Sequence, residues 1–399
     1  MKRFTLLLPC FLYLVTAAAQ VPDTLDAPNK DAVYQRPFIL QGEKRGSLAA
    51  AVGGYVEANT NYFATDGISD GFSMEMRRFN IFLYSTLKER IRFISELEFE
   101  HGVEEIALET ALLDFEFNPA LIFRAGIVLV PIGYFNQNHD SPKWDFVDRP
   151  LVSTTIIPAT YSDIGFGFHG TIPAGSLALT YETYLLNGLQ DGVLNNTENR
   201  TFLPAGKNEA RFGQDNNGSP AAALRLAVKK RKLGEVGFSS FAGYYNTFKQ
   251  DGLRIDESRT AWVFAFDYNF SIGKGQMLGE AALAKIETPK DIGPVFGQTQ
   301  WGFHADFIYP ILNGSLFQWK NLQLSLALRL EALDYNVGAF DETGDHISDH
   351  LLSLVSGISL RFSPNTLLRA NYRYRWDTDL LGNPPAKTAG FQFGFASYF

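Results

Sequence analysis

The stretch LQLSLALRLE (residues 322–331) places a leucine at every second position. The positions between the leucines are polar or small, and they include Arg329 and Glu331. Successive side chains of a β-strand point to opposite faces, so this alternation predicts a strand with one apolar face and one charged face. A tilted strand of about 9–11 residues crosses a bilayer. The stretch therefore has the pattern and the length of a membrane-spanning strand.

The same alternation recurs along the chain, at residues 91–100, 262–270, 368–376 and 391–399, the last of which ends on the aromatic residue Phe399. Short links that form turns alternate along the chain with longer links. Examples of the short links are residues 118–120 and 273–275, and examples of the long links are residues 131–162 and 188–219. Short periplasmic turns and long extracellular loops are typical of outer-membrane barrels. We therefore expect an all-β fold, a transmembrane antiparallel β-barrel of about sixteen strands. The closing aromatic strand resembles the C-terminal sorting signal of outer-membrane proteins.

The N-terminal residues have the pattern of a secretory signal peptide. Met1-Lys2-Arg3 precede an apolar run and then the small residues 17–19. We expect cleavage near Ala19, which also removes Cys10, the only cysteine. The predicted organisation is a signal peptide (1–19), a periplasmic N-terminal arm (20–46) and an outer-membrane barrel (47–399) in a Gram-negative envelope.

Composition and motifs argue against several other classes of protein. The net charge of −8 and the lack of a basic domain argue against nucleic acid as a partner. Residues 165–170 match G-x-G-x-x-G, but their glycines alternate with aromatics inside a strand-like stretch, which does not suit a nucleotide site. His346 and His350 have a spacing that suits metal only on a helix, and we expect them in a solvated loop. The sequence predicts no cofactor, no metal and no enzymatic activity.

The strongest chemical feature is a row of arginines on one parity of the strand at residues 368–376. Arg369, Arg373 and Arg375 would face the lumen, and guanidinium groups suit phosphate and carboxylate oxygens. The row could pass anions along the pore, or it could pair with acidic neighbours and brace the wall. These two interpretations are equally supported. Further arginines fall on polar parities, where acidic residues also occur: Arg78, Arg124, Arg329 and Arg361. We expect a lumen with one basic wall and one acidic wall.

The link at residues 131–162 is too long for a simple hairpin and carries Lys143, Trp144 and Arg149. We expect it to fold into the pore and to constrict it.

Three stretches resemble the family of phosphate-selective porins O and P. They are Met76-Arg77-Arg78-Phe79, then residues 124–127 with 130–133 (RAGI and VPIG), and then residues 146–150 (FVDRP). The resemblance implies a sixteen-stranded, usually trimeric porin that passes anions by an arginine ladder and lysine clusters. The constriction-loop candidate departs from that pattern, because Lys143 is its only lysine.

The predicted function is an outer-membrane porin for passive diffusion of small hydrophilic solutes, with a bias towards anions such as phosphate. The expected partners are outer-membrane lipid, these solutes and two further copies in a homotrimer. The alternative is a barrel-borne enzyme or a surface adhesin that uses the long outer loops. Channel activity in planar bilayers separates the two.

Overall fold

The computed structural model describes residues 40–41, 48–87, 90–207, 212–290, 292–316 and 319–399. The strands of the barrel are β2 (Leu48–Thr65), β3 (Phe72–Leu87), β4 (Ile91–Glu100), β5 (Glu105–Asn118), β6 (Leu121–Leu129), β7 (Ser162–Ala174), β8 (Leu177–Leu186), β9 (Ala221–Lys230), β10 (Gly234–Tyr244), β13 (Thr260–Ile272), β14 (Gly275–Ile286), β15 (Thr299–Leu316), β16 (Trp319–Asp334), β17 (His350–Ser363), β18 (Thr366–Thr378) and β19 (Ala386–Tyr398).

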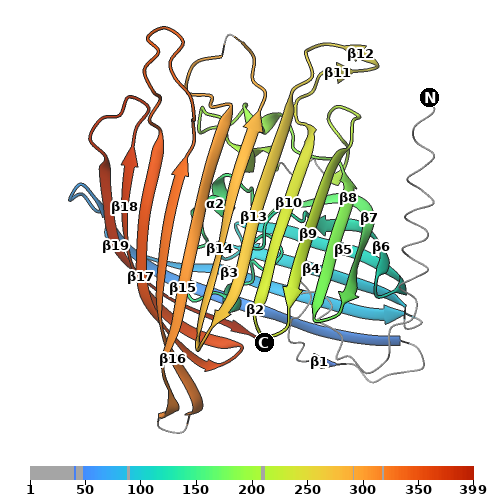
Figure 1. The fold of residues 1–399 in the computed structure, drawn as a ribbon, viewed down its shortest axis with the longest axis vertical. Helices are drawn as coiled ribbons and strands as arrows, with labels where there is room; N and C mark the ends of the chain where they lie inside the picture. Colours follow the sequence, from blue (N-terminus) through green and yellow to red (C-terminus); the bar gives the residue numbers. More distant parts are fainter. Residues whose placement is uncertain (1–39, 42–47, 88–89, 208–211, 291, 317–318) are drawn as a thin grey trace.

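These sixteen strands form one closed antiparallel barrel (Figure 1). Each strand pairs with its neighbours along the chain, and β10 pairs with both β9 and β13. The last strand, β19, pairs with the first barrel strand, β2, so that Phe393 lies opposite Thr60. Closure leaves the sheet without a free edge, which is the condition for a sheet to span a membrane. The predicted fold class is confirmed.

The two faces of each strand differ as the alternation predicts. On β16, Leu326 and Leu328 are about half exposed on the outside of the barrel, whereas Arg329 and Glu331 are fully buried inside it. On β19, Phe391 is 64% exposed. An apolar outer face and a charged inner face are the reverse of a soluble barrel, and they match a lipid-facing wall around a polar lumen.

The two ends of the barrel carry different connections (Figure 1). At one end the strands are joined by links of two or three residues, and at the other mostly by long loops. The link at residues 101–104 is an exception, because it is short although it lies at the loop end. The loop at residues 245–259 contains a small hairpin, β11 (Lys249–Gln250) and β12 (Leu253–Arg254).

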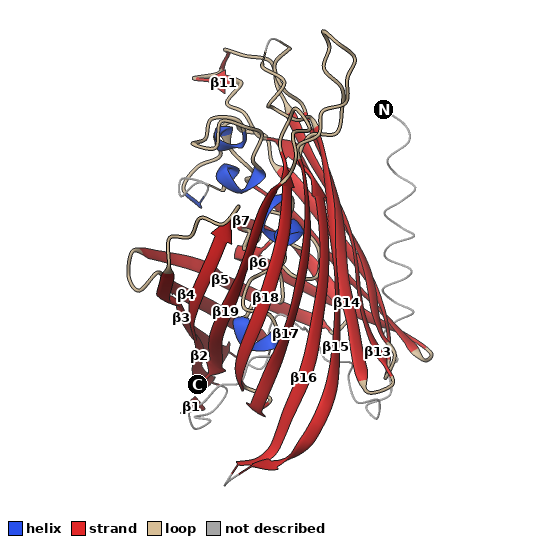
Figure 2. Cartoon of the chain, turned by 90° about the vertical axis from the view of Figure 1, so that its left-hand side faces the viewer, coloured by secondary structure: helices blue, strands red, loops and turns tan. Residues whose placement is uncertain are grey.

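The two longest loops contain short helices. The inner loop, residues 130–161, contains η2 (Ser141–Lys143) and α2 (Leu151–Thr155), and the cover loop, residues 187–220, contains η3 (Asp191–Val193) and η4 (Leu203–Gly206). Figure 2 shows helices among the strands and at the loop end. Among the described residues, no helix is long and apolar enough to cross a membrane.

The two ends of the barrel sequence meet where β19 pairs with β2, which we call the seam. Phe399 and Gly54 exchange backbone hydrogen bonds of 3.0 and 3.2 Å, and the Phe399 ring stacks on Phe79 at 5.4 Å. The predicted signal peptide lies outside the described residues. Of the predicted arm, only β1 (Leu40–Gln41) is described, and it pairs with β2 at Val52 and Ala51.

Candidate functional site

The inner loop turns back into the barrel and is fastened to the wall. Wall side chains on four different strands accept hydrogen bonds from its backbone N–H groups, and buried N–H groups need such acceptors. The contacts are Gly133 N to Ser239 Oγ (2.8 Å), Phe135 N to Glu280 Oε2 (3.1 Å), Val147 N to Asn371 Oδ1 (2.7 Å) and Leu151 N to Glu331 Oε1 (2.8 Å). The loop is therefore held at fixed depth by its main chain.

Gly133 is required where the inner loop passes closest to the wall. Its φ is +69°, a left-handed conformation that favours glycine, and an added Cβ would lie 2.1 Å from Glu280 Oε2. This position belongs to the VPIG stretch (residues 130–133) that the sequence singles out.

An apolar core fills part of the lumen between the inner loop, the cover loop and the wall. Ile132 and Ile156 of the inner loop and Val193 of the cover loop are fully buried in one cluster. Val263 of β13 belongs to the same cluster and faces inward, on the parity opposite the exposed Trp262. This side of the lumen is therefore packed as a protein core.

The cover loop reaches across the mouth of the barrel. Gln300 Nε2 of β15 donates to Thr201 O at 3.0 Å, and Arg200 forms an ion pair with Asp349 at 2.7 Å. The Arg200 guanidinium also lies over the Tyr335 ring, 4.5 Å from its centroid. The cover loop is rich in glycine, asparagine and charged residues. This composition gives no sign in the sequence that the loop folds inward and does not extend into solvent.

The predicted arginine row lies on β18, and two of its three members hold the inner loop. Arg369 forms an ion pair with Glu57 at 2.8 Å and donates to the carbonyl oxygens of Ser141 and Trp144. Arg373 forms an ion pair with Asp148 at 3.0 Å. Arg375 is one-third exposed and pairs with Asp377 on its own strand at 2.7 Å.

The other predicted arginines also have acidic partners. Each lies on a different strand and pairs with a carboxylate of a neighbouring strand or of the inner loop. The pairs are Arg78 with Glu57 (3.0 Å), Arg124 with Asp114 (2.7 Å), Arg329 with Asp306 (2.7 Å) and Arg361 with Asp145 (3.2 Å).

Each of these arginines therefore has a carboxylate beside it in the described part of the lumen. Each arginine reduces the cost of its burial by a carboxylate beside it. The expectation of one basic wall and one acidic wall stays a prediction. This arrangement agrees with the interpretation that the arginine row pairs with acidic neighbours and braces the barrel wall. An anion path along these arginines stays a prediction.

A β-bulge adds Arg77 to the lumen-facing arginines, among which the sequence pattern predicts only its neighbour Arg78 on this strand. The register between β2 and β3 shifts at Glu57/Ala58, so that Arg77 is the extra residue between Met76 and Arg78. A bulge re-aims side chains, and here both arginines turn inward. A lipid-facing arginine costs about 2–4 kcal/mol at the midplane, so two consecutive arginines in a spanning strand were a usable signal for the bulge.

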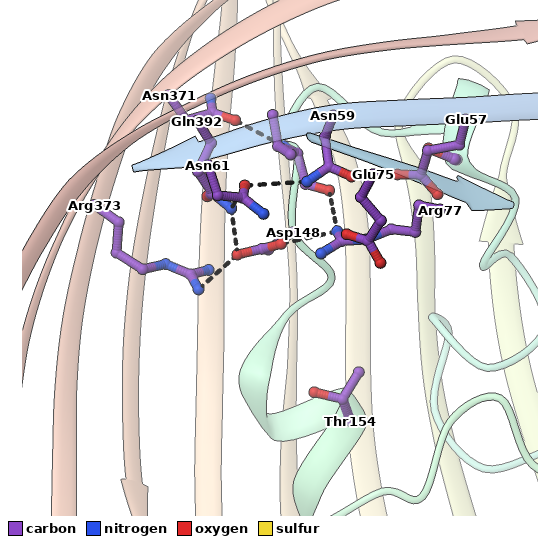
Figure 3. A network of polar contacts seen from close by, with 12 residues as sticks. Glu57, Asn59, Asn61, Glu75, Arg77, Asp148, Thr154, Asn371, Arg373 and Gln392 are labelled. Carbon is purple, nitrogen blue, oxygen red and sulfur yellow. Dashed lines mark hydrogen bonds and ion pairs between the residues drawn. The ribbon is translucent and has the colours of Figure 1, made fainter. Parts of the chain in front are cut away.

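Asp148 of the inner loop lies at the centre of the resulting network (Figure 3). Arg77 contacts its Oδ1 at 2.9 Å, Arg373 contacts its Oδ2 at 3.0 Å, and Gln392 Nε2 donates to Oδ2 at 2.7 Å. The three partners come from β3, β18 and β19, so one carboxylate joins the loop to both sides of the seam.

The predicted constriction residues all lie in or beside η2 and α2. Lys143 is partly exposed and lies 3.5 Å from Asp140. Trp144 is buried, donates from Nε1 to Asn138 O at 2.6 Å, and contacts the Phe135 ring. Arg149 donates to Thr160 Oγ1 at 3.0 Å. These contacts are within the loop, so they stiffen it.

Acid should loosen this attachment only well below neutral pH. Burial raises the pKa of Asp148, but Arg373 and Arg77 lower it more, to about 2. The charged carboxylate therefore stabilises the docked loop above the ordinary pKa of about 3.9, and this stabilisation is lost as the pH falls through about 2. Single-channel recordings should show a steady conductance from pH 7 to 5 and growing fluctuations between pH 4 and 2.

The conductance of the Asp148→Asn variant should fluctuate already at pH 7, because Arg77 and Arg373 then lose their nearest carboxylate. The carboxylates of Glu75 and Glu331 lie farther away, at 3.5 and 3.6 Å. Asp256→Asn is the matched control, since Asp256 pairs with Arg259 in an outer loop. If the conductance fluctuations of the wild-type channel do not change between pH 7 and 2, the charged Asp148 does not hold the inner loop in place.

Comparisons with known proteins support the fold. No family model matches the chain. A protein of Aquifex aeolicus (strain VF5), described as uncharacterized, is 28% identical over 320 residues, which cover 75% of this chain and 68% of that protein.

Similar solved structures are outer-membrane barrels. An anion-selective porin from Comamonas acidovorans has a TM-score of 0.54 and 12% identity, over 88% of this chain and 100% of that one. OmpF of Salmonella typhi, in complex with daunomycin, has a TM-score of 0.55 and 9% identity, over 90% of this chain and 100% of that one. The trimer form of OmpT, an outer-membrane protein of Vibrio cholerae, has a TM-score of 0.54 and 11% identity, over 88% of this chain and 99% of that one.

At these identities the likeness concerns the fold alone. None of these three structures is described as a phosphate-selective porin, so the resemblance to porins O and P stays a prediction. The chain has the sixteen-stranded barrel fold of outer-membrane porins.

Proposed function

We propose that this protein is an outer-membrane porin through which small hydrophilic solutes diffuse passively. The observation that supports this most is the inner loop, fastened at fixed depth inside a barrel whose outer face is apolar and whose inner face is charged. A loop held by main-chain hydrogen bonds narrows the lumen without moving during transport. Such a constriction selects solutes by size and by the charges that line it.

We propose an outer-membrane location after cleavage of residues 1–19, and a homotrimer. The exposed apolar faces of the strands suit lipid, and a similar barrel, OmpT of Vibrio cholerae, is described in a trimer form. Enzymatic activity is not part of the proposal.

Selectivity for anions depends on how far nearby carboxylates offset the charge of the lumen arginines. Arg369 and Arg373 keep their charge, but Glu57 and Asp148 offset it within 3.0 Å. An arginine bound to a carboxylate attracts a passing anion less than an unpaired one does, because the two charges largely cancel at a distance. We therefore expect a small preference for anions, phosphate among them.

Reversal potentials across a salt gradient in planar bilayers test this function. Wild type should conduct and prefer anions slightly. Arg373→Ala should shift the permeability ratio towards cations, because Asp148 then keeps Arg77 but loses one of its two arginine partners. Arg375→Ala is the matched control, since Arg375 pairs with Asp377 and not with the inner loop, and its shift should be smaller.

Two results would contradict the proposal. Folded protein that does not conduct but hydrolyses a substrate or adheres to a surface would favour the enzyme or adhesin alternative. Equal reversal potentials for wild type and Arg373→Ala would remove the arginine row from selectivity while leaving passive conduction in place.

A further inference from the structure

Four carboxylates gather around one histidine where the inner loop meets β4 and β5. They are Glu96, Glu98, Glu109 and Asp140, all buried, and the histidine is His139. The Nε2 atom of His139 lies 3.0 Å from Glu109 Oε2, 3.8 Å from Asp140 Oδ1 and 3.9 Å from Glu96 Oε1. The ligand atoms of Glu96, His139 and Asp140 all lie within 4.8 Å of one another.

A second β-bulge builds this cluster. The register between β4 and β5 shifts at Glu96/Leu97, which lie opposite Thr110 and Leu108, so Glu109 is the extra residue. Both Glu109 and Thr110 consequently face inward and are buried. The bulge brings a carboxylate into the lumen at a place where strict alternation would have turned it to lipid.

The described cations near the cluster are Arg78, Lys143, Arg149 and, when protonated, His139. Arg78 lies 3.3 Å from Glu98 but is shared with Glu57 and Glu100, and Lys143 lies 3.5 Å from Asp140. Burial of a carboxylate is costly unless a positive charge lies beside it. A further cation among these buried carboxylates would lower the cost of their burial.

A separate observation concerns Asn80, which is fully buried and aimed into the cluster. Its Nδ2 donates to Glu96 Oε1 at 2.7 Å and to Glu98 Oε1 at 3.3 Å. Its Oδ1 has no hydrogen-bond partner among the described residues, and neither does the hydroxyl of Thr110, which lies opposite Glu96 in the sheet. Buried oxygens without a donor are uncommon, and a bound water molecule or a bound cation can satisfy them.

We propose that Glu96, Glu109, His139 and Asp140, with Asn80 beside them, form a binding site for a divalent transition-metal ion of the Mn²⁺ or Zn²⁺ type. One imidazole among carboxylate oxygens suits these ions better than Mg²⁺, which prefers oxygen ligands alone. Metal–ligand distances are about 2.0–2.2 Å, so the ligand atoms need to draw together by about 1 Å. The sequence analysis predicts no metal site, because these residues are spread over two strands and a loop.

The site has a structural consequence. His139 and Asp140 belong to the inner loop, whereas Glu96 and Glu109 belong to the wall, so the ion joins the two. This role does not depend on which solutes the barrel passes, and the test can fail while passive conduction holds.

Calorimetric titration of the full chain, folded in detergent and treated with a chelator, tests the site with Zn²⁺ or Mn²⁺ alone. We expect about one ion per chain, and Glu109→Gln and His139→Gln should weaken binding by roughly tenfold or more. His169→Gln is the matched control, because His169 is also buried beside a carboxylate, Asp114 at 3.5 Å, but outside the cluster.

Three outcomes would overturn the proposal: neither ion binds, Glu109→Gln binds as wild type does, or His169→Gln weakens binding as much as His139→Gln. Anomalous diffraction from wild-type crystals soaked in Zn²⁺ decides the case if the variants do not fold. A peak between His139 and Glu96 is expected, and a peak elsewhere alone counts against the site.

Discussion

Replacing residues 137–148 of the inner loop by a short Gly/Ser link should raise the single-channel conductance several-fold. Almost all of these residues are buried inside the barrel, so they occupy lumen volume that ions cannot cross. A barrel of this strand number leaves an aqueous channel when its lumen is not filled. The increase should be measured in planar bilayers at fixed salt concentration.

The same replacement should move the reversal potential towards anions. It removes Asp145 and Asp148, the carboxylates that pair with Arg361 and Arg373. Those arginines then remain on the wall with fewer compensating charges. A deletion of residues 339–346, in a largely exposed outer loop, is the matched control and should leave both quantities unchanged. An unchanged conductance after the inner-loop replacement, in a barrel that still folds, would show that this loop is not the constriction.

Strand positions and faces could be predicted from the sequence because a two-residue period is a local property. On β18, Arg369, Asn371 and Arg373 are buried, whereas Tyr372 is exposed, as their parities predict. The same holds for Trp262 and Phe266 against Asp267 on β13. Neither assignment needed knowledge of any distant residue.

The partners of the arginines could not be predicted, because they are set by the closed barrel and by the path of a loop. Arg369 meets Glu57 only because β19 pairs with β2 and brings the two ends of the chain together. Arg373 meets Asp148 only because the inner loop turns inward. The inward direction of two further residues, Arg77 and Glu109, could not be predicted either. They lie in β-bulges, and strict alternation along the strand assigns them to the lipid face.

The largest loss of stability should follow from Arg329→Met. Arg329 and Asp306 lie opposite each other on β16 and β15, and both are buried with almost no exposure. Two parallel hydrogen bonds of 2.7 Å join them, which is the strongest geometry for this kind of pair. Arg329 also donates to Asp148 O at 2.9 Å and lies over the Phe146 ring at 4.2 Å, so it holds the inner loop as well.

Removal of Arg329 leaves the Asp306 carboxylate buried beside His304 without its main counter-charge. Breaking a buried pair in this way costs about 3–5 kcal/mol, so the free energy of unfolding in lipid should fall by that amount. Urea titration followed by tryptophan fluorescence measures it. Arg375→Met is the matched control, because the Arg375–Asp377 pair is one-third exposed and such pairs contribute about 0–1 kcal/mol.

The double variant Arg329→Met with Asp306→Leu separates the two roles of Arg329. Replacing both charges by apolar side chains removes the unpaired carboxylate, so stability should return to near the wild-type value. The hydrogen bond to Asp148 O is still absent, so the channel should still fluctuate more than wild type. A double variant that is as unstable as Arg329→Met would mean that the loop contact, and not the buried ion pair, is the main source of stabilisation at this position.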